Sequence, residues 1–225
     1  MAVDLSKLTP AEMAAHLGRP DGDVGNSVSL QMNKTNGNIT LHTYRRLGLG
    51  LAMDVLEIGP ANGHMLPELI QIAPGMRYTG LDISEIMVAE ANRFNAARVA
   101  AGQASFRLGN AASVPLADAS LDRVFAINVV YFWPDALAPL REIRRVLRPS
   151  GFSVIAAISP DTVAASASPA ALRGDNFHHR DAASLIALHQ QAGFRDVQVE
   201  MVTEFVRFLD GRDWQRDYNL VIARP

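Results

Sequence analysis

Short apolar runs alternate with longer segments of helical period along most of the chain after residue 50. The first two runs, at 54–58 and 76–82, are bounded by Gly, Pro or Asp, as buried parallel strands usually are. Between them, the apolar residues from Met65 to Ile70 have the spacing of one helix face. Strands and helices that alternate in this way predict an α/β fold, with a parallel sheet covered by helices on both faces.

The same alternation continues to residue 223. We expect a third strand that ends before Asn110 and a fourth strand, with its exit loop, within 120–134 that ends near Asn128. Further strands are expected at 152–158, 197–202 and 218–223, and helices at 85–99, at 134–147 and at 182–191.

Residues 1–50 carry helical signals of their own. Thr9-Pro10-Ala11-Glu12 combines a capping box with proline at the first helical position, and this helix is expected to end near Gly18. Because the segment is too short for a domain, we expect it to form a helical cap over the carboxyl edge of the sheet. Its expected parts are a turn-rich stretch at 21–26, two short helices at 27–33 and 39–49, and a break at 36–37.

The first strand ends in a loop that contains two glycines, Gly59 and Gly63. Glycine allows a sharp turn and a close approach of a ligand, and ligands of such sheets bind at the carboxyl ends of the strands. A dinucleotide fingerprint G-x-G-x-x-G that started at Gly59 would need glycine at Ala61 and His64, so the loop does not match it.

Polar side chains also follow the next three strands. Asp82 lies about twenty residues past the loop, where a carboxylate can accept hydrogen bonds from the ribose hydroxyls of a nucleoside. The alternative is that Asp82 only caps the following helix together with Ser84. Asn110 follows the third strand, and Asn128 lies near the end of the fourth.

The pattern acid-x-Gly-x-small-x-Gly, with Glu57 as the acid and Gly63 as the last glycine, resembles motif I of the class I S-adenosylmethionine (SAM) dependent methyltransferases. Ala61 stands where the commonest version has glycine. The resemblance is to the small-molecule, quinone-biosynthesis-like branch and covers residues 51–225. It implies a Rossmann-like α/β fold with a seven-stranded sheet, an antiparallel last strand beside strand six and helices on both faces.

The resemblance also implies the chemistry, which is transfer of the SAM methyl group to an N, O or C nucleophile of a small molecule, leaving S-adenosylhomocysteine (SAH). Asn110 replaces the family's acid, and its side-chain oxygen could still accept the adenine amino group. Asn128 lies where the cofactor and substrate sites of the family meet. The cofactor-binding residues implied are Glu57, Gly59, Pro60, Ala61, Asn62, Gly63, Asp82, Ile83, Met87, Asn110, Ala111 and Asn128.

No catalytic residue is assigned, because this chemistry does not require a general base. The candidates for one are His42, His64 and Tyr131. The substrate wall is expected from residues 25–45, from the loop that carries Tyr131 and Trp133, and from an insertion at 159–180. Within 1–50, the residues that could face a ligand are Met32, Asn33, His42 and Tyr44.

Composition limits the remaining classes. At 225 residues the chain has the size of one domain, 1–225, made of the cap at 1–50 and the core at 51–225. A net charge of -2 gives no argument for a nucleic-acid partner, and the arginines between 141 and 148 are expected to form a solvated face. The chain contains no cysteine, and the adjacent His178 and His179 cannot share a helix face, so no metal site is expected.

No signal peptide and no membrane-spanning run is expected, so the expected location is cytoplasmic. The oligomeric state stays open. One alternative function is a nicotinamide-dependent oxidoreductase, which His64 and the lack of a Tyr-x-x-x-Lys pair disfavour. The other is a non-catalytic protein that binds SAM or SAH, which would have the same cofactor residues.

Overall fold

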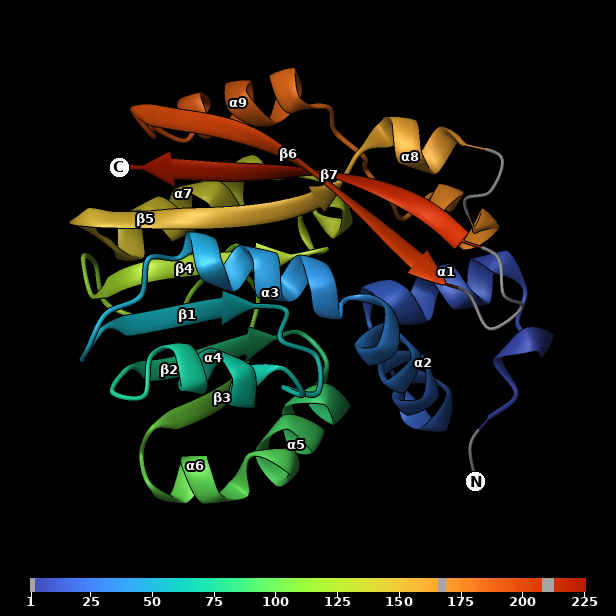
Figure 1. Cartoon of the computed structure of the whole chain (residues 1–225), viewed down its shortest axis with the longest axis horizontal. Coiled ribbons are helices and arrows are strands. Elements are labelled where there is room, and N and C mark those ends of the chain that lie inside the picture. The colour runs from blue at the N-terminus through green and yellow to red at the C-terminus, as the bar shows by residue number, and fades with distance from the viewer. Residues whose placement is uncertain (1–2, 166–168, 208–212) are drawn as a thin grey trace.

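The computed structural model describes residues 3–165, 169–207 and 213–225, and these residues form a seven-stranded sheet in the order β3-β2-β1-β4-β5-β7-β6 (Figure 1). Strand β7 runs antiparallel to both β5 and β6, while the pairs from β3 to β5 are parallel. The Rossmann-like sheet with an antiparallel last strand is therefore confirmed. The strands are β1 (Asp54–Ile58), β2 (Arg77–Asp82), β3 (Ala104–Leu108), β4 (Leu121–Ile127), β5 (Leu147–Ile158), β6 (Asp196–Arg207) and β7 (Asp213–Arg224).

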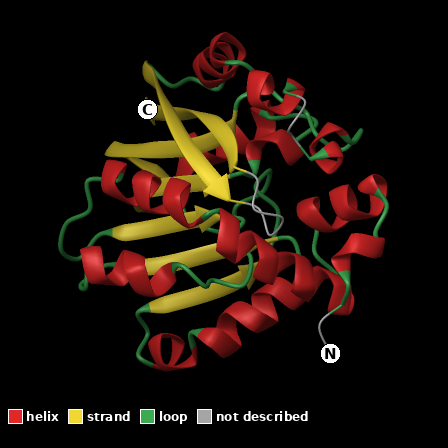
Figure 2. Ribbon diagram, turned by 45° about the vertical axis from the view of Figure 1, so that its right-hand side comes forward, coloured by secondary structure: helices red, strands yellow, loops and turns green. Residues whose placement is uncertain are grey.

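Helices cover both faces of this sheet, as Figure 2 shows. Side chains alternate along each strand, so Val55 and Phe125 pack in one hydrophobic cluster while Leu56 and Val124 pack in another. The first cluster includes residues of α3 (Gly37–Arg46), α4 (Leu66–Ile72) and α5 (Glu85–Phe94), and the second includes residues of α7 (Leu137–Val146) and α9 (Ala182–Gln191).

The N-terminal helices α1 (Pro10–Gly18) and α2 (Gly22–Thr35) lie beyond the carboxyl ends of the parallel strands (Figure 1). The predicted capping box is present, because Thr9 Oγ1 accepts the Glu12 N–H at 3.2 Å and Glu12 Oε2 accepts the Thr9 N–H at 2.8 Å. The break at 36–37 is also present, with Asn36 between α2 and α3.

The predicted turn-rich stretch at 21–26 is wrong, because α2 already begins at Gly22. Asp21 caps the helix by accepting the Gly22 N–H at 3.0 Å. Gly25 then allows a close contact, since a Cβ there would lie 2.6 Å from the carbonyl carbon of Pro20. A glycine that suggested a turn is used here to pack a helix against the preceding chain.

Other predicted boundaries also change. The helix predicted at 85–99 is divided into α5 and α6 (Ala96–Ala100), because buried Asn95 turns its side chain to the carbonyls of Gly63 and Ala91. Strands β5, β6 and β7 are each longer than predicted, and α7 begins at Leu137 and not at 134–135 as predicted. The insertion at 159–180 contains α8 (Pro160–Ala164) and a 3₁₀-helix, η3 (Ala170–Arg173), while its positions 166–168 lie outside the described residues.

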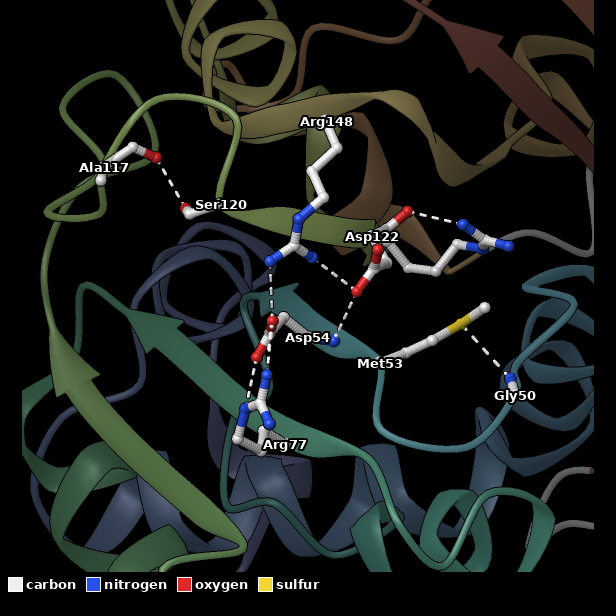
Figure 3. A network of polar contacts seen from close by, with 9 residues as sticks. Gly50, Met53, Asp54, Arg77, Ala117, Ser120, Asp122 and Arg148 are labelled. Atoms are coloured by element: carbon white, nitrogen blue, oxygen red, sulfur yellow. Dashed lines mark hydrogen bonds and ion pairs between the residues drawn. The ribbon is translucent and has the colours of Figure 1, made fainter.

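At the amino ends of the strands, Arg148 joins two of them (Figure 3). Its guanidinium contacts Asp54 of β1 at 2.9 Å and Asp122 of β4 at 2.6 Å, and Arg77 of β2 also pairs with Asp54 at 2.6 Å. The arginines predicted to form a solvated face are therefore partly structural. Arg144 likewise donates to the Gly193 carbonyl, and Arg145 pairs with Glu142 and Asp118.

Within the described ranges, no helix is long and apolar enough to cross a membrane.

Candidate functional site

A cavity of about 530 Å³ lies at the carboxyl edge of the sheet. The loops after β1, β2, β3 and β4 form one side of it, and residues of α1 and α2 form the other. This volume is in the usual range for a small-molecule site. The predicted site residues that line it are Glu57, Gly59, Pro60, Ala61, Gly63, Asp82, Ile83, Asn110, Ala111 and Asn128.

Two of the predicted cofactor residues do not line this cavity. The Asn62 side chain turns back into its own loop, where Oδ1 accepts the His64 N–H at 3.2 Å, and its Nδ2 contacts Ser29 Oγ. Met87 is fully buried in α5.

The loop after β1 needs its glycines for two separate reasons. Gly59 and Gly63 have φ of +73° and +64°, in the left-handed region that favours glycine. A Cβ on Gly59 would lie 2.6 Å from Val129 Cγ2, and one on Gly63 would lie 2.9 Å from Asn95 Nδ2. Ala61 also has a positive φ of +48°, a conformation that glycine adopts more readily than alanine.

Asp82 connects the loops after β1 and β2. Its Oδ2 accepts the Ala61 N–H at 3.0 Å, and its Oδ1 accepts the Ser84 N–H at 2.9 Å. Burial raises the pKa of Asp82 to about 6, although these backbone hydrogen bonds oppose the shift. Each carboxylate oxygen keeps a second acceptor position, so Asp82 can serve the fold and still accept hydroxyl groups from the cavity.

Glu57 is the other carboxylate of the cavity, and it is 9% exposed. Burial raises the pKa of Glu57 to about 7, and the hydrogen bond that the Tyr78 hydroxyl donates to it opposes the shift. A nearby cationic group would stabilise the ionised form of such a buried acid.

Asn110 and Asn128 also line the first cavity. Asn110 Oδ1 accepts the Ala112 N–H at 2.9 Å, which holds the loop after β3 in its turn. Asn128 has a φ of +59°, and its buried Oδ1 makes no hydrogen bond of good geometry among the described residues.

A second cavity of about 300 Å³ adjoins the first. Asn128, Met32 and Phe132 are among the residues that line both. Its further wall comes from α1, α2, the 3₁₀-helix η2 (Val130–Phe132), the insertion after β5, and the β6–β7 hairpin.

The sequence analysis missed the residues of this hairpin. Its side chains at the second cavity are Val206, Trp214, Arg216 and Tyr218. The signal that could have found them is the period of two in Trp214, Arg216 and Tyr218, which places all three on one face of a strand.

Of the predicted ligand-facing residues in 1–50, Met32 and Asn33 line the first cavity, whereas His42 and Tyr44 line neither. Trp133 lines the first cavity and Tyr131 the second.

The candidate bases are not equivalent in this structure. His64 lines the first cavity and packs on the Phe94 ring, with centroids 5.3 Å apart. Burial raises the pKa of Tyr131 well above its ordinary value, which makes a phenolate there unfavourable.

No cluster of three or more His, Cys, Asp or Glu side chains with metal-binding geometry occurs among residues 3–165, 169–207 and 213–225. The His179 ring is occupied by the Leu172 carbonyl at 2.7 Å and by stacking on Phe177.

Comparison with known proteins shows which sequences and folds resemble those of this chain. A family model described as a methyltransferase domain matches residues 56–155. O-methyltransferase resE of Aspergillus sclerotiorum is 32% identical over 132 residues, which are 58% of this chain and 49% of that protein. The ubiquinone/menaquinone biosynthesis C-methyltransferase UbiE of Paracoccus denitrificans is 37% identical over 100 residues, which are 43% of this chain and 39% of that protein. The chain thus spans half the length of these relatives or less.

Among solved structures, phosphoethanolamine N-methyltransferase 2 of Haemonchus contortus, in complex with phosphomonomethylethanolamine and SAH, has the same fold. The TM-score is 0.74 at 14% identity, over 97% of this chain and 60% of that one. Residues 56–155 thus match a methyltransferase domain, and the chain is similar in sequence to SAM-dependent methyltransferases of small molecules. The solved structure shows that the whole sheet has the fold of these enzymes.

Proposed function

We propose that this chain is an enzyme that transfers the methyl group of SAM to an O, N or C atom of a small molecule. The core at 51–225 would bind the cofactor, and the cap at 1–50 would close the site. The observation that carries the proposal is the first cavity, which brings Glu57, Asp82 and Asn128 together at one edge of the sheet.

The residues around this cavity fit the chemical groups of SAM. Asp82 has free acceptor positions for two ribose hydroxyls, and Glu57 is a buried carboxylate that a cationic amino group would stabilise. The glycines at 59 and 63 leave room for a ligand close to the backbone. Asn110, Ala111 and Ile83 line the part of the cavity beyond Asp82, where we place the adenine ring.

When bound, SAM supplies a methyl group made electrophilic by a positively charged sulfur. The chain's own contribution would be to align the acceptor with that methyl group and to exclude water. Asn128 could contribute to this alignment, because its polar side chain lines both cavities. No residue needs to act as a general base in this scheme.

We also propose that the acceptor is a small molecule and not a nucleic acid. The net charge is -2, and the arginines of α7 and β5 that could suggest a basic face are partly engaged in internal ion pairs. We further propose a cytoplasmic location, which is compatible with a chain that contains no cysteine for disulfide formation. Cell fractionation would test the location.

Ligand-dependent stability tests the cofactor assignment. SAH at about 100 times its Kd should stabilise the fold by about 2.7 kcal/mol, which raises the melting temperature by several degrees. NADH should give no shift. Stabilisation by NADH without stabilisation by SAH would contradict the proposal and favour an oxidoreductase. Binding of SAH without methyl transfer to any acceptor tested would favour a non-catalytic binding protein.

A further inference from the structure

The second cavity is built differently from the first. Its wall is mostly apolar and aromatic, with side chains such as Met13, Phe132 and Phe177. It is reached through the shared boundary at Asn128, beside the predicted cofactor site. A molecule in this cavity would therefore lie next to the groups around the first cavity.

Two buried polar atoms face this apolar space without a well-formed hydrogen bond. Tyr218 Oη and Asn128 Oδ1 make no hydrogen bond of good geometry within the described part of the chain, and both residues line the cavity. Burial raises the pKa of Tyr218, and the side chains of Asn128 and Glu204 lie within hydrogen-bonding reach of its hydroxyl group, so the three groups are neighbours. An unsatisfied buried polar group is unfavourable, and a ligand that supplies the missing bond removes this cost.

The two atoms have complementary roles. The phenol of Tyr218 stays protonated at neutral pH, because its pKa is raised, and it can donate a hydrogen bond. Asn128 Oδ1 can only accept one. A hydroxyl group is the smallest group that can accept a hydrogen bond from Tyr218 Oη and donate one to Asn128 Oδ1.

The charge of the cavity wall is balanced. Arg216 is the charged residue among those that line the cavity in the described ranges, and it forms an ion pair with Glu204. Both side chains are buried, and Arg216 also donates to the Thr35 carbonyl in the cap. Because Arg216 is already neutralised, a charged ligand would lose its hydration without gaining a counter-ion.

We propose that the second cavity is the acceptor site, and that it takes a neutral, mainly apolar ring compound whose hydroxyl group is held by Tyr218 and Asn128. Tyr218 is a positioning residue in this proposal, which rests on the proposed function.

The test uses the full chain saturated with SAH and measures binding of three probes by calorimetry. The probes are 2-naphthol, naphthalene and 2-naphthoate, which share one ring system and differ in the hydroxyl group and the charge. We expect 2-naphthol to bind at least tenfold more tightly than 2-naphthoate. Tighter binding of 2-naphthoate would overturn the assignment to neutral acceptors.

The variant Tyr218→Phe removes only the hydroxyl group of the protein. It should weaken 2-naphthol about tenfold and leave naphthalene unchanged. An equal effect on both probes, or none on either, would overturn the role of Tyr218.

Filling the cavity gives an independent test. Met13 of α1 lines the second cavity and not the first, so Met13→Trp should abolish binding of 2-naphthol and naphthalene without changing SAH affinity. The matched control is Ala15→Trp, because Ala15 is an exposed residue of the same helix and lines neither cavity. Unchanged probe binding in folded Met13→Trp would overturn the location. If Met13→Trp does not fold, the Tyr218→Phe comparison decides.

SAH affinity separates this proposal from the function on which it rests. A parent protein that binds SAH but none of the probes would overturn the acceptor site alone. A parent protein that does not bind SAH would overturn the proposed function.

Discussion

At the scale of single residues, Asp82 has two roles that two measurements can separate. It accepts backbone hydrogen bonds within the fold, and we propose that it binds the ribose of the cofactor. Asp82→Ala should remove the acceptor of the ribose hydroxyls and weaken SAH binding by about 1.5–3 kcal/mol for each charge-assisted hydrogen bond lost. It should also lower stability, because the N–H groups of Ala61 and Ser84 lose their acceptor. Calorimetry with SAH and urea unfolding measure the two effects.

Ser84→Ala is the matched control for that change. Ser84 Oγ caps α5 by accepting the Met87 N–H at 3.3 Å, and it also donates to the Pro20 carbonyl at 2.6 Å, so its loss should cost about 1–3 kcal/mol of stability. SAH affinity should stay close to that of the parent. If Asp82→Ala instead behaves like Ser84→Ala, then Asp82 is a structural residue and the ribose assignment is wrong.

Glu57 should make stability depend on pH. Its folded pKa of about 7 lies above the ordinary value of 4.5, so the folded state binds the proton more tightly than the unfolded state. The stabilisation of the protonated form is therefore lost as pH rises through this window. Between about pH 5 and about pH 7.5 the loss is about 2 kcal/mol.

Glu57→Gln should remove this contribution, since the amide oxygen can still accept the Tyr78 hydroxyl and does not titrate. Urea unfolding at both pH values measures the difference between parent and variant. The same slope in both proteins would show that Glu57 titrates near its ordinary pKa.

At the scale of elements, the two ends of the sheet should be energetically separate. Arg148 connects Asp54 and Asp122 at the amino ends of β1 and β4, opposite the cavities. Because Arg148 is 34% exposed, Arg148→Ala should cost only about 1–2 kcal/mol of stability and leave the SAH Kd unchanged. Arg141→Ala, on an exposed side chain of the same region, is the control. A weaker SAH affinity in Arg148→Ala would show coupling between the two ends.

Elements also show what the sequence could predict. β1 and β2 were predicted nearly to the residue, because each is a buried apolar run that ends in Gly or Asp. The capping box of α1 is a local signal and was predicted too. The start of α2 was not, because Gly25 owes its place in a helix to contact with Pro20, which no local pattern reveals.

In the candidate site, too, local patterns predicted one part and long-range packing determined the other. Most predicted residues of the first cavity line it, because they follow consecutive strands whose carboxyl ends meet at one edge. The second cavity joins the cap to a hairpin about 180 residues later, as the contact from Arg216 to Thr35 shows. Pairing of segments so distant depends on packing, so the sequence alone did not indicate it.

At the scale of the whole molecule, the cap should respond to the cofactor. Leu17, Met32 and Asn33 belong to α1 and α2 and line the first cavity opposite the loops of the core. SAH should therefore slow amide hydrogen exchange in α1 and α2, because opening the cap would expose the ligand. Mass spectrometry with and without SAH measures this, with α6 as an internal reference that lines neither cavity. Equal exchange in α1 and α2 would show that the cap does not close on the cofactor.

The segment that matches the family model, 56–155, ends before β6 and β7 and begins after α1 and α2. Much of the second cavity therefore comes from parts of the chain outside the matched segment. If this cavity is the acceptor site, as we propose, substitutions there would change the acceptor while the cofactor edge stays intact. Paralogues of this chain should be sorted by residues such as Met13, Trp214 and Tyr218, and not by their similarity across the core.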